Sequence, residues 1–347
     1  MAMVHRLLDR LGIVVPLVQA PMAGSQDERL AIAVAAAGGL GSLPCAMLSP
    51  EAIALQVRRF RAGGSWPLNL NFFCHEPPAI DAERERAWRD RLRPYYEELG
   101  LDPEEPRAAA ARSPFDSALC ALVEELRPEV VSFHFGVPAP DLLARVRATG
   151  ACVVSTATTV AEARHLEAAG CDAIVAQGVE AGGHRGMFLV TEVDTQVGTF
   201  ALVPQIVDAV RVPVLAAGGI ADARGVAAAL ALGASGVQVG TAFLRTPEAT
   251  PSAVHRAALA SARDDATRLT TIFSGRPARG LENRVMRELG PRPSGTPPFP
   301  RAASALAALR AEAEARGSGD FSPLWAGQAA SLARETSAAE VVRSLFP

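Results

Sequence analysis

The chain has 347 residues, 49% of them hydrophobic, and a formal net charge of −3. This length and hydrophobic content are sufficient for one large domain with an extensive core. The small net charge excludes a protein that binds nucleic acid or anionic membranes mainly through a basic surface. The first residues lack the apolar region of a signal peptide, and no run approaches the length of a membrane-spanning helix, so we expect a cytoplasmic protein.

Apolar segments recur along the chain at intervals that predict eight β-strands. Most are followed by a helical pattern rich in alanine, which is the arrangement of βα units in a parallel sheet. Eight such units predict an α/β protein with a closed (β/α)8 TIM barrel. The predicted strands are 14–19, 40–43, 67–73, 130–135, 151–155, 173–177, 212–216 and 236–240. The predicted outer helices include 29–37, 50–61, 140–149, 159–169 and 222–232.

Two segments do not fit this eightfold repeat. Residues 75–129 are charged and punctuated by proline, and they predict a helical insertion with helices at 81–99, 105–112 and 115–125. The residues after the eighth strand carry helical patterns broken by a Pro-rich stretch. The predicted domains are a barrel over 1–246 with its insertion at 75–129, a small helical domain over 247–319, and a C-terminal return to the barrel over 320–347.

Three predicted strands end in glycine turns, and this repetition indicates a ligand site. Residues 176–186 read Ala-Gln-Gly-Val-Glu-Ala-Gly-Gly-His-Arg-Gly, and the later strands end at Gly218-Gly219 and Gly240-Thr241. Because glycine has no Cβ, its backbone N–H can approach a phosphate or a flat ring closely. In a TIM barrel a phosphate commonly binds after strands seven and eight, which end at the last two turns. One Gly-Gly turn alone would be a weak signal.

The chain contains no lysine, so all 34 of its Lys and Arg positions are arginine. Schiff-base aldolases, pyridoxal phosphate enzymes and Walker A NTPases each need a lysine amine and are therefore excluded. What remains is a barrel that binds phosphate through backbone amides and arginine, for which FMN is the natural ligand. None of the six histidines has the spacing of metal ligands, so no metal site is predicted.

Three further motifs complete the pattern. Residues 18–24 read Val-Gln-Ala-Pro-Met-Ala-Gly, 69–75 read Asn-Leu-Asn-Phe-Phe-Cys-His, and 132–136 read Ser-Phe-His-Phe-Gly. With the glycine turns, they resemble the nitronate monooxygenase family, formerly called 2-nitropropane dioxygenase, in its bacterial class I branch. The resemblance follows the order of the motifs over nearly the whole chain.

The resemblance implies an FMN enzyme that uses dioxygen and needs no nicotinamide. Its substrates would be alkyl nitronates, including the toxin propionate 3-nitronate, and detoxification would be its role. The products would be an aldehyde or semialdehyde and nitrite or nitrate, formed through a flavin semiquinone. Since the cofactor performs the redox chemistry, the protein would mainly bind the cofactor and the substrate, orient them, and set the charge around them. We expect a monomer or a homodimer.

The resemblance also assigns cofactor contacts to residues at the ends of predicted strands. Asn71 and Gln177 would contact the flavin ring or its ribityl chain, because an amide can both donate and accept hydrogen bonds. A turn or capping role is the alternative for both. The residues implied in FMN binding are Ala20, Pro21, Met22, Asn71, Gln177, Gly182, Gly183, Gly218, Gly219, Gln238, Gly240 and Thr241.

His134 ends the fourth predicted strand and is the first candidate catalytic residue. Its imidazole can remove the α-proton of a nitroalkane or hydrogen-bond to a nitronate oxygen. His184 is the second candidate, because a cationic imidazole would favour an anionic substrate and a reduced flavin; its alternative role is to hold its loop. Arg185 either supplies charge or is solvated. Residues 274–280, Ser-Gly-Arg-Pro-Ala-Arg-Gly, resemble the family's second-domain loop near the site.

Three other functions stay open at this point. An FMN-dependent NAD(P)H reductase of quinones or enoyl-acyl carriers would share the barrel and glycine turns, although His134 between two phenylalanines argues against it. A barrel that binds a phosphorylated metabolite without flavin, and a non-catalytic flavin-binding or storage module, are the others. Relatives often line the substrate pocket with tyrosines, whereas the only tyrosines here, Tyr95 and Tyr96, lie in the predicted insertion.

Overall fold

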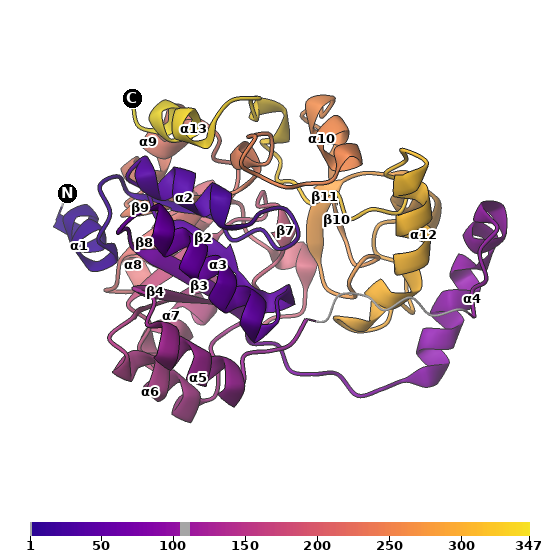
Figure 1. The fold of residues 1–347 in the computed structure, drawn as a ribbon, viewed down its shortest axis with the longest axis horizontal. Helices are drawn as coiled ribbons and strands as arrows, with labels where there is room; N and C mark the ends of the chain where they lie inside the picture. The colour runs from indigo at the N-terminus through magenta and orange to yellow at the C-terminus, as the bar shows by residue number, and fades with distance from the viewer. Residues whose placement is uncertain (1, 105–111) are drawn as a thin grey trace.

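Eight parallel strands form a closed barrel in the computed structural model, which describes residues 2–104 and 112–347 (Figure 1). The strands are hydrogen-bonded in the order β1-β9-β8-β6-β5-β4-β3-β2, and a bridge between Val18 and Leu40 closes the barrel. The strands are β1 (Leu17–Gln19), β2 (Gly41–Pro44), β3 (Leu68–Phe73), β4 (Val130–His134), β5 (Cys152–Ala157), β6 (Ala173–Gln177), β8 (Val214–Ala217) and β9 (Gly236–Val239). The eight predicted strands and the TIM barrel are confirmed.

β1 is shorter than the predicted strand 14–19. Val14 is 78% exposed. The backbone N–H groups of Val14 and Val15 both donate to the carbonyl of Gly38, at 2.9 and 3.0 Å, so they are not available to the sheet. Pro16 has no N–H to donate. The first backbone group to bond to the sheet is the Pro16 carbonyl, which accepts from the N–H of Val237 at 2.9 Å, and β1 begins at Leu17.

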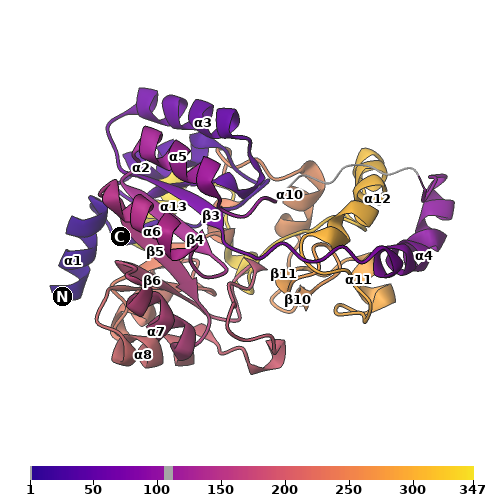
Figure 2. The ribbon, with the colours of Figure 1, turned by 90° about the horizontal axis from the view of Figure 1, so that it is seen from below.

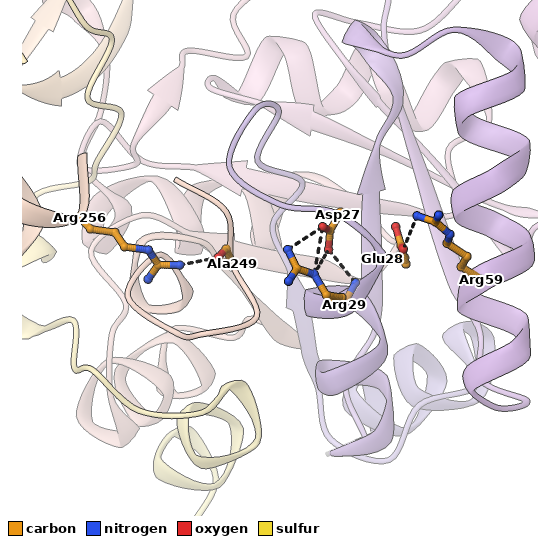
Figure 3. Close-up of polar contacts among 6 residues, drawn as sticks. All are labelled: Asp27, Glu28, Arg29, Arg59, Ala249 and Arg256. Atoms are coloured by element: carbon orange, nitrogen blue, oxygen red, sulfur yellow. Dashed lines mark hydrogen bonds and ion pairs between the residues drawn. The ribbon is translucent and has the colours of Figure 1, made fainter. Parts of the chain in front are cut away.

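Helices surround the barrel, and several begin at a residue whose side chain caps them. The surrounding helices are α2 (Glu28–Ala36), α3 (Pro50–Gly63), α5 (Ser117–Leu126), α6 (Pro140–Ala148), α7 (Val160–Ala169), α8 (Thr199–Ala209) and α9 (Ala223–Ala231). The Asp27 carboxylate caps α2 by accepting from the backbone N–H of Arg29 at 2.9 Å (Figure 3). Glu28 pairs with Arg59 at 3.1 Å and thereby ties α2 to α3.

The core has one layer inside the barrel and another between the strands and their helices. Inside the barrel, Val130, Val175 and Leu215 are buried together with Leu7 and Leu11 of α1 (Ala2–Leu11). Strand residues that alternate with these pack against the outer helices. α1 therefore closes the amino-terminal end of the barrel, and the strands' carboxyl-terminal ends face the other side.

The segment between β3 and β4 divides between two packing environments. In α4 (Ala82–Leu99), Trp88 and Leu92 lie four residues apart on one face, and they are buried with Leu309 of α12 (Ser304–Ala315). α5 packs instead on α3 and α6, as part of the ring around the barrel. Figure 2 shows α4 beside α12, far from α1. The predicted helix 105–112 lies outside the described residues except for Arg112.

A second unit beside the barrel mouth combines helices with a small sheet. β10 (Thr267–Thr270) and β11 (Ala278–Leu281) are antiparallel, and β11 also pairs with β7 (Gly183–His184) from the glycine loop. Its helices are α10 (Ala253–Ala260), α11 (Arg284–Leu289) and α12, and after it α13 (Ala338–Leu345) packs on α2 and α9. The short 3-10 helices are Cys45–Met47, Val193–Thr195, Thr241–Phe243, Arg301–Ala303 and Ala330–Leu332. Of the helices in the described residues, none is long and apolar enough to span a bilayer.

Candidate active site

A cavity lies at the carboxyl-terminal ends of the barrel strands, where TIM-barrel enzymes hold their ligands. Its lining comes from the turns that follow the barrel strands, from the second unit and from the C-terminal return. Every residue predicted for the site lines this cavity: Ala20, Pro21, Met22, Asn71, His134, Gln177, Gly182, Gly183, His184, Gly218, Gly219, Gln238, Gly240 and Thr241. The structure therefore brings them all together in one cavity.

A buried glutamine pair holds the turn that follows β1. Gln19 Nε2 donates to Gln26 Oε1 at 2.7 Å, and the backbone N–H of Met22 donates to the same oxygen at 2.8 Å. Gln26 Nε2 in turn donates to the carbonyl of Ser42 at 2.6 Å. Both glutamine side chains are buried, so these bonds are shielded from water. The network sets the wall of the cavity at Ala20 and Met22, and Gln26 was not among the predicted residues.

Asn71 of β3 is oriented by Ser132 of β4, its partner in the parallel register. Asn71 Nδ2 donates to Ser132 Oγ at 2.9 Å and to the Ser132 carbonyl at 3.3 Å. Because this nitrogen is already engaged, the amide oxygen Oδ1 is the atom that Asn71 can offer to a ligand, as an acceptor.

Gln177, at the end of β6, is engaged with the glycine loop through both atoms of its amide. Its Nε2 donates to the carbonyl of His184 at 3.0 Å, and its Oε1 accepts from the backbone N–H of Gly186 at 2.8 Å. A ligand contact from this amide would have to share or replace these bonds. The geometry therefore supports the turn role of Gln177 that the sequence left open.

Arg185 is fully buried, so it is not the solvated residue that was one of its two expected roles. Its guanidinium donates to the carbonyls of Gly178 and Gln177 at 2.6 and 2.7 Å, and to Gln196 Oε1 at 3.0 and 3.1 Å. Burial lowers the pKa of Arg185 from its ordinary 12.5 to about 9, a value at which it stays cationic at neutral pH. The guanidinium thus fixes the backbone of Gln177 and Gly178, where the glycine loop begins.

The turns after β8 and β9 present backbone donors to the cavity. Gly218 and Gly219 have φ of +114° and +72°, a region that side chains rarely adopt. Among the described residues, the N–H groups of Gly219, Ile220 and Thr241 have no hydrogen-bond acceptor. Unpaired N–H groups at cavity-lining turns are suited to an anionic oxygen such as that of a phosphate.

Glu180 lies close to the turn after β8, and its carboxylate is already hydrogen-bonded. A Cβ built on Gly219 would lie 3.5 Å from Glu180 Cβ. The Glu180 carboxylate accepts from the backbone N–H of Thr199 at 2.8 and 2.9 Å, at the start of α8, and from the Thr199 hydroxyl at 2.8 Å. The positive end of α8 therefore offsets the repulsion that this carboxylate would exert on a bound phosphate.

His134 is held at both ring nitrogens. Its Nε2 lies 3.2 Å from the carbonyl oxygen of His184, and its Nδ1 lies 3.2 Å from Thr156 Oγ1. Burial lowers the pKa of His134 from 6.5 to about 3, and the hydrogen bond to the His184 carbonyl only partly opposes this. The positive charges of Arg276 and Arg185 lower the pKa further. The ring is therefore neutral at neutral pH.

His184 lines the cavity from β7 and contacts the second unit. Its Nε2 is 2.8 Å from Ser274 Oγ, so the predicted loop 274–280 does reach the site. Burial lowers the pKa of His184 well below 6.5, and Arg112 and His134 lower it further. These surroundings favour a neutral ring over the cationic imidazole that was expected to attract an anionic substrate.

Phenylalanine and tryptophan rather than tyrosine are the aromatic neighbours of the two histidines. Of these, Phe73 and Trp325 line the cavity, whereas Phe299 is not among its lining residues. Phe73 lies 5.9 Å from His134 and Phe299 lies 5.3 Å from His184, between ring centroids. Tyr95 and Tyr96 are buried in the cluster between α4 and α12 and do not line the cavity. Phe299 was not predicted as a site residue, because no local pattern distinguishes it from a core phenylalanine.

The C-terminal return supplies a further piece of the wall that was not predicted. The backbone N–H of Gly327 donates to Thr241 Oγ1 at 2.9 Å. A Cβ built on Gly182 would lie 2.5 Å from the backbone nitrogen of Gly327, so the two segments are in close contact. Ala326 and Gly327 have small side chains or none, and this is the sequence signal for such an approach.

The barrel and the cavity at its carboxyl-terminal end, which both His134 and His184 line, are those of an enzyme of the (β/α)8 class. Residues 5–347 match the family model described as nitronate monooxygenase. The chain is 46% identical over 348 residues to a nitronate monooxygenase from Pseudomonas aeruginosa, covering 99% of this chain and 98% of that protein. It is 44% identical over 342 residues to one from Paraburkholderia phytofirmans, covering 98% and 93%.

Two solved structures are similar over nearly their whole length. The nitroalkane oxidase of Streptomyces ansochromogenes has a TM-score of 0.88 and 38% identity, covering 98% of this chain and 96% of that one. FabK from Thermotoga maritima has a TM-score of 0.74 and 27% identity, covering 98% and 94%. The chain belongs to the nitronate monooxygenase family. It is accordingly an oxidoreductase with nitronate monooxygenase activity.

Proposed function

We propose that this protein binds FMN and uses dioxygen to oxidise alkyl nitronates, such as propionate 3-nitronate. The products would be an aldehyde or semialdehyde together with nitrite or nitrate. When bound, FMN would supply the redox chemistry. The observation that carries the proposal is the position of the His134 imidazole in a cavity whose glycine turns also present unpaired N–H groups.

The residues of the cavity fit FMN. The unpaired N–H groups of Gly219 and Thr241 would hold one phosphate, since both lie in turns that line the cavity. Ala20 and Met22 would provide an apolar surface for the ring, and Asn71 Oδ1 would accept from a ring or ribityl donor. No attachment residue is needed, so we propose that the flavin is bound non-covalently.

The protonation state of His134 favours a substrate that arrives ionised. A base whose conjugate acid has a pKa of about 3 accepts a proton from a neutral nitroalkane with little driving force. A nitronate has already lost that proton and needs only to be oriented. We therefore propose that nitronates are the preferred substrates and that neutral nitroalkanes react more slowly.

The absorbance spectrum of the purified protein tests this proposal. We expect flavin bands, release of FMN on denaturation, and spectral change of the bound flavin on anaerobic addition of ethyl nitronate. Readmission of dioxygen should restore the original spectrum and yield nitrite or nitrate. Bleaching by NADH or NADPH without reaction toward ethyl nitronate would instead indicate the reductase, and a colourless protein would indicate a barrel without flavin.

A further inference from the structure

Thr156, a residue of β5 that was not predicted for the site, lies beside His134 in the lining of the cavity. The residue is 6% exposed, and it lines the cavity together with His134. Its Oγ1 is 3.2 Å from His134 Nδ1, and no other hydrogen-bond partner of this hydroxyl occurs in the described part of the chain. The lone pairs of the hydroxyl are therefore available to a ligand.

The bonds of His134 determine which of its nitrogens carries the proton. The carbonyl oxygen of His184 can only accept hydrogen bonds, and it already accepts one from Gln177 Nε2 at 3.0 Å. The contact of 3.2 Å from His134 Nε2 therefore requires a proton on Nε2. In the neutral ring the lone pair is then on Nδ1, so the hydroxyl of Thr156 must be the donor in the second contact.

The surroundings of the ring keep it in this orientation. A Cβ built on Gly186 would lie 2.6 Å from Thr156 Cγ2 and 3.0 Å from His134 Cε1, so the loop backbone packs closely on both side chains. The charged groups that act on the ring are the cations Arg276 and Arg185. Neither offers an acceptor that could stabilise the opposite tautomer.

We propose that the hydroxyl of Thr156 relays a proton from a neutral nitroalkane in the cavity to Nδ1 of His134, an inference that rests on the proposed function. The Cα–H bond of the substrate breaks, and its electron pair stays on the substrate, which becomes a nitronate. The proton passes to Thr156 Oγ1 while the hydroxyl's own proton passes to Nδ1. The ring becomes an imidazolium, and its Nε2–H bond to the His184 carbonyl is retained.

Turnover of two substrates by FMN-loaded variants tests the relay. We expect Thr156→Val, which replaces the hydroxyl by a methyl group of similar size, to lower kcat/KM for nitroethane by about 10² or more, and for pre-ionised ethyl nitronate by less than about threefold. Thr156→Ser keeps the hydroxyl and should retain nearly the parent value on both substrates. Because an exchangeable hydroxyl proton moves in the step, the parent should show a solvent deuterium isotope effect with nitroethane and not with ethyl nitronate. Parent-like turnover of nitroethane by Thr156→Val would overturn the relay.

A second measurement does not depend on turnover. In the FMN-loaded protein with 15N-labelled histidine, assigned by means of His134→Asn, we expect a protonated Nε2 and an unprotonated Nδ1 at neutral pH. Thr156→Val should shift the Nδ1 resonance and leave Nε2 nearly unchanged. A proton on Nδ1 in the parent would overturn the inference. A protein that binds FMN and oxidises ethyl nitronate, but whose His134 carries its proton on Nδ1, would keep the proposed function and lack the relay.

Discussion

His134 and His184 are joined through the backbone and not through their rings, because Nε2 of His134 donates to the carbonyl oxygen of His184 at 3.2 Å. The carbonyl belongs to the glycine loop, which also pairs with β11 of the second unit. The orientation of the imidazole at the end of β4 therefore depends on where that loop lies. Any change that displaces the loop is expected to displace the ring as well.

Replacing His134 should affect two substrate forms unequally. His134→Asn can keep a donor toward the His184 carbonyl but has no basic nitrogen. We expect kcat/KM for nitroethane to fall by about 10² to 10⁴, and that for ethyl nitronate to fall much less, because a nitronate needs no base. Equal losses on both substrates would reduce His134 to a binding residue. Unchanged kcat/KM for both substrates would mean that His134 has no part in catalysis and would leave His184 as the candidate base.

Gly219→Val should yield folded protein with little flavin. The residue has φ of +72°, which is strained for valine, whereas the space is adequate because the nearest atom to a built Cβ lies 3.5 Å away. Relief of that strain would turn the N–H away from the phosphate. We expect at least about tenfold weaker FMN binding, measured by fluorescence titration of the flavin-free protein. The matched control is Gly100→Val, with φ of +71° and no described atom within 4 Å, which should stay yellow. Full flavin occupancy in Gly219→Val would mean that the phosphate binds elsewhere.

Loss of Arg185 should destabilise the fold. Arg185→Met would leave the carbonyls of Gln177 and Gly178 without the donors that they now have in the interior. An unsatisfied buried group costs about 1–3 kcal/mol, so we expect the free energy of unfolding to fall by at least about 2 kcal/mol. The control is Arg224→Met, which removes an exposed ion pair with Asp222. It should change the free energy of unfolding by no more than about 0.5 kcal/mol. Denaturant titration of both variants checks this, and equal stability would contradict the structural role.

Stability should decrease as the pH falls below the ordinary pKa of histidine. Burial lowers the pKa of His255 from 6.5 to about 4, as it lowers that of His134 to about 3. Between pH 6.5 and about 4, His255 binds a proton in the unfolded chain but not in the folded protein. The stability present above pH 6.5 is therefore lost on acidification. Each such imidazole contributes up to about 1.4 kcal/mol per pH unit. The free energy of unfolding of His255→Gln, measured from about pH 7 to about pH 5, should depend less on pH than that of the parent, and identical slopes would refute this assignment.

The barrel and its glycine turns could be predicted from the sequence because their causes are local. An apolar run bounded by turn residues forms a buried strand, and β6 has the bounds predicted for it, Ala173–Gln177. Gly218 and Gly219 do adopt the positive φ that their residue type permits. Parallel strands place all their carboxyl-terminal ends on one side, so knowing the strands was enough to bring Asn71 and His134 to one cavity.

The tertiary structure decided which partners these residues have. His184 and Ser274 are 90 positions apart and meet only because the second unit pairs its β11 with β7. Burial of Arg185 and the neutral rings of His134 and His184 likewise depend on surrounding packing, since a pKa follows from desolvation and neighbouring charges. A sequence records which groups can donate, accept or ionise. Their distances, and hence their protonation, exist only once distant segments have packed together.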